Sequence, residues 1–448
     1  MKTPNTFLAT ALALVATIST THATVLYVNV NSATPAPPYT TWATAATNIQ
    51  DAANAAGSGD EIVVTNGTYT PVTVNTPLLV QSVNGPGGTV IDGGGAAPCV
   101  YLTNNAVLVG FTLTNGSGGV YCEDASAVVS NCVLTGNSSD VGGGAYGGTL
   151  NNCTLTGNSA ISILYFGGYG GGAYGSTLNN CTLTGNSASL GVKSDFTSGG
   201  GAAYCMLNNC TLTGDSAVYG GGAYDCTLNN CIDYYNGPYG GNYDASSTLN
   251  YCCTTPLPSG IGNITNAPLF VDYAGGNVRL QSNSPCINSG NNAYVVGSTD
   301  LDGNPRIVGG TVDIGAYEYQ TPTSILSYAW LQQYGLPTDG SADYADTDGT
   351  GQNNLFKYVA GLDPTNPASV FVLNVANASN QYQAMNLNFN PLALGRTYTP
   401  QFSTDLAGGV WLPLTTYTSL LTNGSQVTIT DTNPIPPQEF YRIDISLP

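Results

Sequence analysis

The 448-residue chain carries 26 acidic but only 7 basic side chains, which gives a net charge of −19. Phosphate binding requires clustered cations, so this balance excludes nucleic acid as a partner and disfavours anionic membranes and tightly held acidic polysaccharides. Low charge can indicate disorder, but a strict internal repeat predicts stacked turns instead.

The first 23 residues have the pattern of an export signal. Lys2 is followed by an apolar stretch at 7–18 that is short for a membrane span, and Thr21-His22-Ala23 ends in small residues. We expect cleavage after Ala23 and a mature chain that is secreted or held at the cell surface; the alternative is a membrane anchor. No later segment is apolar and long enough to predict a transmembrane helix.

A strand and a helix are predicted ahead of the repeat. Tyr27–Val30 alternates as a strand, and Thr47–Ala56 places Ile49, Ala52, Ala53 and Ala56 on one helical face. Such a helix can cover the open apolar end of a solenoid. The segment 59–64 then opens the first coil.

The motif Asn-Asn-Cys recurs with a period of about 21 residues, and two gaps are longer by seven or eight. Its cysteines are Cys132, Cys153, Cys181, Cys210, Cys231 and Cys252. A glycine run ending in an aromatic residue precedes each of the central copies. A fixed period with short β-compatible segments predicts a solenoid whose coils stack at about 4.8 Å.

One coil can be assembled from side-chain alternation. Tyr146 and Leu150 are expected to point inward from one strand, and Cys153 and Leu155 from the next. The odd spacing between the two pairs requires a corner at Asn151-Asn152, because asparagine tolerates left-handed backbone. Gly157-Asn158 is the next predicted corner, which gives a three-sided parallel β-helix.

The twelve cysteines would ordinarily suggest disulfides in an exported chain. Stacking at about 4.8 Å with parallel Cβ vectors instead holds the Cβ atoms outside the usual range for a disulfide. We therefore expect the cysteine ladder to be mostly free thiol inside the core, with Cys205 and Cys226 stacked likewise.

Three stretches resemble known families. Residues 26–92 resemble the start of bacterial secreted pectin-lyase-like proteins, and the Gly-Gly-Gly-Ala-Tyr and Thr-Gly-Asn repeats are similar to those of polymorphic outer-membrane proteins. The motifs at 284–290, 299–306 and 312–318 resemble the choice-of-anchor Q domain, which closes β-helices of surface-attached proteins. The resemblance implies a right-handed β-helix over 24–320 and export. It does not imply catalysis, because the fold hosts lyases, hydrolases, adhesins and spacers.

Residues 321–369 are predicted to form a linker, a helix at Ile325–Tyr334 capped by Ser324, and an Asp-rich loop. The loop resembles calcium loops of dockerin-like or thrombospondin type 3 repeats, which implies that calcium is a possible cofactor bound by Asp343, Asp346, Asp348 and Asn354. Thr350 and Lys357 depart from that pattern, so we expect at most weak binding, with Lys357 a candidate for the cation's place. The alternative is a polar turn.

Alternating segments from residue 370 to 448 predict a small C-terminal β-sandwich. They are Val370–Leu373, Gln383–Phe389, Thr397–Phe402, Val427–Thr430 and Phe440–Ile445.

Catalytic residues are hard to assign. The only histidine, His22, lies in the signal, which excludes Ser-His-Asp and Cys-His sites from the mature chain. Carboxylates on neighbouring coils, such as Asp215 and Asp233, occupy different positions relative to the repeat cysteine, so no paired acids are expected. The block between residues 101 and 250 holds one lysine and no arginine, whereas lyases on this fold need a basic side chain.

The two long coils carry insertions at the same edge of the solenoid. We expect a ligand to contact the aromatic and polar residues there, on or beside the insertions: Tyr165, Phe166, Tyr169, Lys193, Asp195, Phe196 and Tyr219. The alternative is a satellite core packed over the coils. The leading hypothesis is a non-catalytic surface protein that binds glycans or surface proteins. A carbohydrate-active lyase or hydrolase and a structural spacer are the other two.

Overall fold

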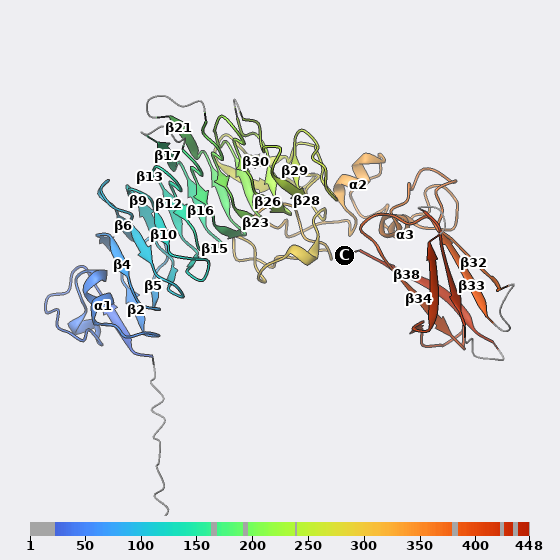
Figure 1. Cartoon of the computed structure of the whole chain (residues 1–448), viewed down its shortest axis with the longest axis horizontal. Coiled ribbons are helices and arrows are strands. Elements are labelled where there is room, and N and C mark those ends of the chain that lie inside the picture. Colours follow the sequence, from blue (N-terminus) through green and yellow to red (C-terminus); the bar gives the residue numbers. More distant parts are fainter. Residues whose placement is uncertain are drawn as a thin grey trace, which may run out of the picture.

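A computed structural model describes residues 23–162, 168–190, 196–237, 240–378, 384–421, 425–432 and 438–447. The predicted export signal, apart from Ala23, lies outside these residues. The described chain is almost entirely β-structure, as predicted. A stack of coils follows a small N-terminal cap and leads through two short helices to a separate group of antiparallel strands (Figure 1).

The N-terminal cap contains the predicted helix. Helix α1 (Ile49–Ala55) begins after Asn48, whose side chain accepts a hydrogen bond from the amide of Asp51. Ile49, Ala52 and Ala53 are buried against the first coils, which confirms the predicted apolar face, although Ala56 only ends the helix. A short 3-10 turn, η1 (Trp42–Thr44), precedes the helix.

Three parallel sheets form the sides of the solenoid. The first sheet contains β1 (Val25–Val28), β2 (Glu61–Val64), β5 (Leu79–Ser82), β8 (Val107–Val109), β11 (Val128–Ser130), β15 (Thr149–Asn151), β19 (Thr177–Asn179), β23 (Met206–Asn208), β26 (Thr227–Asn229) and β28 (Thr248–Asn250). The second contains β3 (Gly67–Tyr69), β6 (Thr89–Asp92), β9 (Thr112–Thr114), β12 (Val133–Thr135), β16 (Thr154–Thr156), β20 (Thr182–Thr184), β24 (Thr211–Thr213), β27 (Ile232–Asp233) and β29 (Cys253–Thr254). The third contains β4 (Val72–Val74), β7 (Val100–Leu102), β10 (Val120–Cys122), β14 (Ala145–Tyr146), β18 (Ala173–Tyr174), β22 (Ala202–Ala203) and β25 (Ala223–Tyr224).

The two predicted corners are confirmed. Asn152 has a φ of 52° and Gly157 a φ of 62°, so both adopt the left-handed conformation that a sharp bend requires. Leucines at the strand centres then stack from coil to coil, as in the register Leu155↔Leu183↔Leu212, and form one continuous core.

The inward position predicted for Tyr146 is wrong. Ala145 is the buried residue of β14, and Tyr146 faces outward. The sequence reasoning treated Tyr146 to Leu150 as one strand, but Gly147 and Gly148 both have positive φ and form a third corner between β14 and β15. The tyrosine of each glycine run is therefore on the surface.

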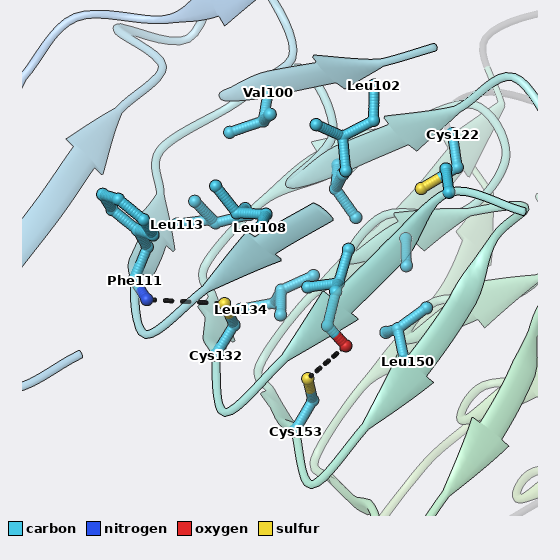
Figure 2. Packing of buried hydrophobic residues seen from close by; sticks show 14 of the residues in the cluster. Val100, Leu102, Leu108, Phe111, Leu113, Cys122, Cys132, Leu134, Leu150 and Cys153 are labelled. Atoms are coloured by element: carbon cyan, nitrogen blue, oxygen red, sulfur yellow. Dashed lines mark hydrogen bonds between the residues drawn. The ribbon is translucent and has the colours of Figure 1, made fainter. Parts of the chain in front are cut away.

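The cysteine ladder lies in the core as free thiols, as predicted. All twelve cysteines fall in the described part of the chain and are buried. Four ladder sulfurs accept a hydrogen bond from a backbone amide of the preceding coil, for example from Cys153 to the Cys181 sulfur at 3.4 Å; the others are those of Cys132, Cys210 and Cys231. Figure 2 shows Cys132 and Cys153 among leucines of the neighbouring strands. Burial raises the pKa of Cys153 well above its usual value, so the thiol is neutral.

The segment that resembles the choice-of-anchor Q domain runs back along one corner of the solenoid. Corner asparagines of four successive coils donate side-chain hydrogen bonds to its carbonyls: Asn152 to Asp300, Asn180 to Val296, Asn209 to Tyr294 and Asn230 to Asn291. The hairpin β30 (Phe270–Asp272) and β31 (Asn277–Leu280) and the turn η2 (Asn292–Tyr294) belong to this closure segment.

The C-terminal part begins with two short helices, α2 (Tyr328–Gln333) and α3 (Asn354–Ala360). Helix α2 starts three residues later than predicted and is capped by Ser327, because the Ser324 hydroxyl donates to Asp343 instead. The predicted sandwich follows as two antiparallel sheets. One has β32 (Val372–Asn377), β33 (Met385–Asn390), β37 (Val427–Asp431) and β36 (Tyr417–Leu421); the other has β35 (Leu412–Pro413), β34 (Thr397–Ser403) and β38 (Phe440–Ser446).

Candidate functional site: an aromatic face on the solenoid

A row of tyrosines runs along the outside of the third sheet. In strict register, Tyr101, Tyr121, Tyr146 and Tyr174 come from four successive coils. Their ring centroids are 5.4, 4.8 and 5.4 Å apart, and the rings are nearly parallel, with interplanar angles of 7°, 4° and 19°. Because the rings cover one another's faces, each presents its edge to the outside.

The row continues past a register position that lacks an aromatic side chain. Ala203 occupies the position of Tyr174 on the next coil, and the following residue, Tyr204, turns into the vacant place with a φ of 56°. Its ring meets Tyr174 and Tyr224 edge-on at 5.4 and 5.7 Å and lies 6.2 Å from Tyr169. The tyrosine row therefore extends over six coils and reaches the edge from which the insertions emerge.

The described residues of that edge lie close to the row. Single β-bridges join Tyr169 to Ser198 and Ser198 to Tyr219, so these residues occupy one position on successive coils. Phe196 stacks on Tyr219 at 6.0 Å with an interplanar angle of 15°, and 61% of Phe196 is exposed. The structure thus brings Phe196 and Tyr219 together and joins Tyr169 to the tyrosine row. Tyr165, Phe166, Lys193 and Asp195 lie outside the described residues.

The bases of the insertions contain a small packed cluster. A three-stranded sheet contains β13 (Ser138–Ser139), β17 (Ser159–Ser162) and β21 (Ser187–Leu190). Ala160 of β17 and Ala188 of β21 form a buried group with Ala217. The satellite core that we gave as the alternative stays a prediction, because most of the first insertion lies outside the described residues; the aromatic pair Phe196–Tyr219 is exposed. The tyrosine row was missed as a site because Tyr146, near its centre, was expected inside the solenoid.

Three phenols of the row, those of Tyr101, Tyr174 and Tyr204, have a raised pKa and are neutral at ordinary pH. Desolvation, with smaller repulsion from Tyr224 and Tyr169, raises the pKa of Tyr204 to about 12. Desolvation also raises the pKa of Tyr101 and of Tyr174. A neutral phenol can donate and accept one hydrogen bond each, so the row presents uncharged hydroxyls to a ligand.

The four residues proposed for calcium each have other partners in the structure. Asp343 accepts from Ser324 and from the amide of Ile325, and Asp346 accepts from the amides of Thr350 and Gly351. Asn354 is buried and donates to Ala342.

Asp348 forms an ion pair with Lys357 in which both side chains are almost fully buried. The ammonium of Lys357 thus contacts the carboxylate that we proposed as a calcium ligand. Calcium binding stays a prediction.

Asp215 and Asp233, which occupy different positions relative to the repeat cysteine in the sequence, both point into the solenoid. Asp215 lies in a ladder of buried corner asparagines, Asn137, Asn158 and Asn186, and accepts from the Asn186 side chain at 3.0 Å. Asp233 occupies the inward position that Leu212 holds one coil earlier. Desolvation raises the pKa of Asp215 to about 8, and desolvation with repulsion from Asp215 raises that of Asp233. Because neither carboxyl is accessible, the pair cannot act on a substrate in this structure.

No protein-family model matches the chain, and no curated protein matches it. Among the described residues, none of the helices has the length and apolar character needed to cross a bilayer.

Proposed function

We propose that this chain is a secreted or surface-displayed, non-catalytic β-helix protein that binds neutral glycans through its aromatic face. We define this face as the tyrosine row with Tyr169, Phe196 and Tyr219. The observation that carries the proposal is the uninterrupted tyrosine row over six coils. Exposed aromatic rows on a rigid scaffold are typical of binding surfaces rather than of solvent-facing sheet.

The ring arrangement favours hydrogen bonding over ring stacking along most of the row. Stacked rings have no free faces, so a ligand meets hydroxyls and ring edges, one phenol per coil. Phe196 supplies a more exposed ring at the edge, where a sugar ring can pack. The lack of charge on these side chains favours a neutral polyhydroxy ligand, and the net charge of −19 opposes a polyanion.

A glycan panel tests the proposal with the mature chain and three variants. Tyr121→Ala with Tyr146→Ala interrupts the row at its best-stacked pair, and Phe196→Ala with Tyr219→Ala removes the edge. Tyr344→Ala is the matched control, because that tyrosine is 69% exposed and lies in the Asp-rich loop. We expect both double variants to lose at least tenfold in affinity for the bound glycan while the control is unchanged.

The same panel separates the alternatives. Release of reducing sugar or unsaturated uronide would show that the chain is an enzyme and not a binding protein. An absence of binding to every glycan would favour the spacer. Loss of the thermal transition in the Phe196→Ala and Tyr219→Ala variant would assign the edge to packing instead of recognition.

A further inference from the structure

A cavity of about 660 Å³ lies where the solenoid, the closure segment, the two short helices and the C-terminal sandwich meet. Its volume is within the range typical of small-molecule sites, and such sites are common at junctions between domains. The lining includes Tyr251 and Asn266 after the last coil, Thr311 of the closure segment, Trp330 and Gln333 of α2, and Arg396 of the sandwich. The cavity is separate from the aromatic face.

Tyr251 departs from the repeat at this place. The preceding four coils have asparagine at the same corner, and each asparagine donates to the closure segment. Tyr251 keeps the left-handed φ of 52°, which disfavours a bulky side chain. Its buried hydroxyl, whose polar neighbour is the Asn291 side chain, donates no hydrogen bond in the described part of the chain. A strained residue with an unsatisfied polar group beside a cavity points to a ligand that completes it.

Arg396 is a cation that forms no ion pair with any of the described residues. Its guanidinium donates to the carbonyls of Val359 and Tyr358 at the end of α3 and to Gly395, at 2.6, 3.2 and 3.3 Å. Three of five N–H groups are thereby used. The salt bridges found among the described residues do not include Arg396, and no carboxylate is found among the residues that line the cavity. In a chain so rich in acids, a guanidinium that lines a cavity with no carboxylate among the described lining residues is suited to an external anion.

The other polar side chains that line the cavity are suited to hydrogen bonds with hydroxyl groups of a ligand. The side chains of Gln333, Asn266 and Thr311 form no hydrogen bond within the described part of the chain, and each lines the cavity. Trp330 contributes an aromatic ring, which meets Tyr358 edge-on at 5.4 Å. Amides, hydroxyls, an aromatic ring and one guanidinium together match a sugar that carries a carboxylate.

We propose that this cavity binds a single uronic-acid residue, with its carboxylate on Arg396 and a hydroxyl on Tyr251. The source is a free sugar acid or the terminal residue of an acidic glycan. A long polyuronide is disfavoured because the remainder of the chain would face a protein of net charge −19.

Calorimetric titration of the mature chain tests the proposal with glucuronic acid, its methyl ester, glucose and a galacturonic acid trimer. We expect glucuronic acid to bind at least tenfold more tightly than the ester or glucose. Arg396→Gln should reduce that affinity at least tenfold, and Tyr251→Phe about fivefold, since it removes one hydrogen bond. Arg442→Gln, which alters an arginine of the same sandwich that packs on Trp411, should bind like the parent chain.

The outcomes are distinct. Binding of the trimer together with the monosaccharide identifies a glycan terminus as the source, and binding of the monosaccharide alone identifies a free sugar acid. Equal binding of the acid and the neutral sugars, or no binding of either acid, overturns the proposal. If Arg396→Gln destabilises the helix end that it caps, Tyr251→Phe decides, because it leaves Arg396 and the fold intact. Variants of the aromatic face should not alter these affinities.

Discussion

Replacing Asp215 by asparagine should stabilise the protein at neutral pH. In the asparagine ladder, each side-chain oxygen accepts from the previous coil, and each NH₂ group donates to a leucine carbonyl, as Asn158 does to Leu134 and Asn186 to Leu155. Continued by one coil, the same register would set the carbonyl of Leu183 opposite the second oxygen of Asp215, which has no hydrogen-bond partner among the described residues. Two acceptors then face each other unless the carboxyl is protonated.

The magnitude follows from the raised pKa. The unfolded carboxyl titrates near 3.8 and the folded one at about 8. At pH 7 the Asp215 carboxyl is ionised in the unfolded chain and mostly protonated in the folded chain. Folding therefore requires the carboxyl to take up a proton at a pH where a free carboxyl is ionised. This costs about 4 kcal/mol at most, at about 1.36 kcal/mol per pH unit. An asparagine side chain at this position would avoid that cost, and we expect Asp215→Asn to add about 2–4 kcal/mol of stability at pH 7.

The pH dependence has a definite sign. Because the folded pKa is raised, the contribution of Asp215 to stability is fully present below about pH 3.8 and is lost as the pH rises through 8. Urea unfolding at pH 4, 6 and 8 should show that the stability of Asp215→Asn declines less steeply with pH; the remaining slope comes from the other buried carboxyls with a raised pKa, Asp233, Asp313 and Glu318. Asn186→Asp is the matched control: it adds a carboxyl to the ladder and should make the decline of stability with pH steeper. Equal slopes for parent and variant, or a less stable variant at pH 7, would refute the reasoning.

Three further predictions concern the Asp-rich loop, the cysteine ladder and the corner at Tyr251. Lys357→Glu should lower the thermal midpoint without calcium, because it replaces the ammonium that contacts the Asp348 carboxylate by a second carboxylate. If calcium does not restore the thermal midpoint, the loop is not a calcium site. Thiol titration in denaturant without reductant should find close to all twelve cysteines free, and a count near zero would contradict the stacked-thiol geometry. Tyr251→Asn should raise stability by about 1 kcal/mol in thermal unfolding by relieving left-handed strain, whereas a loss of stability would show that the ring contributes more than the strain costs.

The coil period could be predicted because each copy repeats the same inward and corner residues. Leu155 and Cys153 keep a constant spacing, so a single register explains all copies, and Asn152 can be assigned to a bend from its chemistry. The third corner was missed because glycine is compatible with a strand and with a turn. Only the positive φ values of Gly147 and Gly148 show that the strand ends before them.

Contacts between distant segments could not be predicted from local patterns. Ser324 and Ser327 are equally good helix caps in the sequence, and the choice depends on Asp343, which draws the Ser324 hydroxyl away. Counting from the repeat cysteine likewise led to the prediction that Asp215 and Asp233 do not pair. The count measures position along a coil, whereas a corner side chain and a strand side chain can both turn into the same interior.

In a chain of nearly identical coils, a residue that breaks the repeat must be accommodated by neighbours that were not selected for it. Ala203 leaves a gap that Tyr204 fills at the surface, and the cost is a left-handed tyrosine. Asp215 keeps the ladder bond that asparagine makes but leaves an oxygen unsatisfied in the core. Tyr251 loses the bond to the closure segment and gains a cavity beside its hydroxyl. The first two exceptions are compensated within the protein: the gap at Ala203 is filled by the ring of Tyr204, and the carboxyl of Asp215 takes up a proton. The third has none within the described chain, and this is why we place a ligand there and not at the other two.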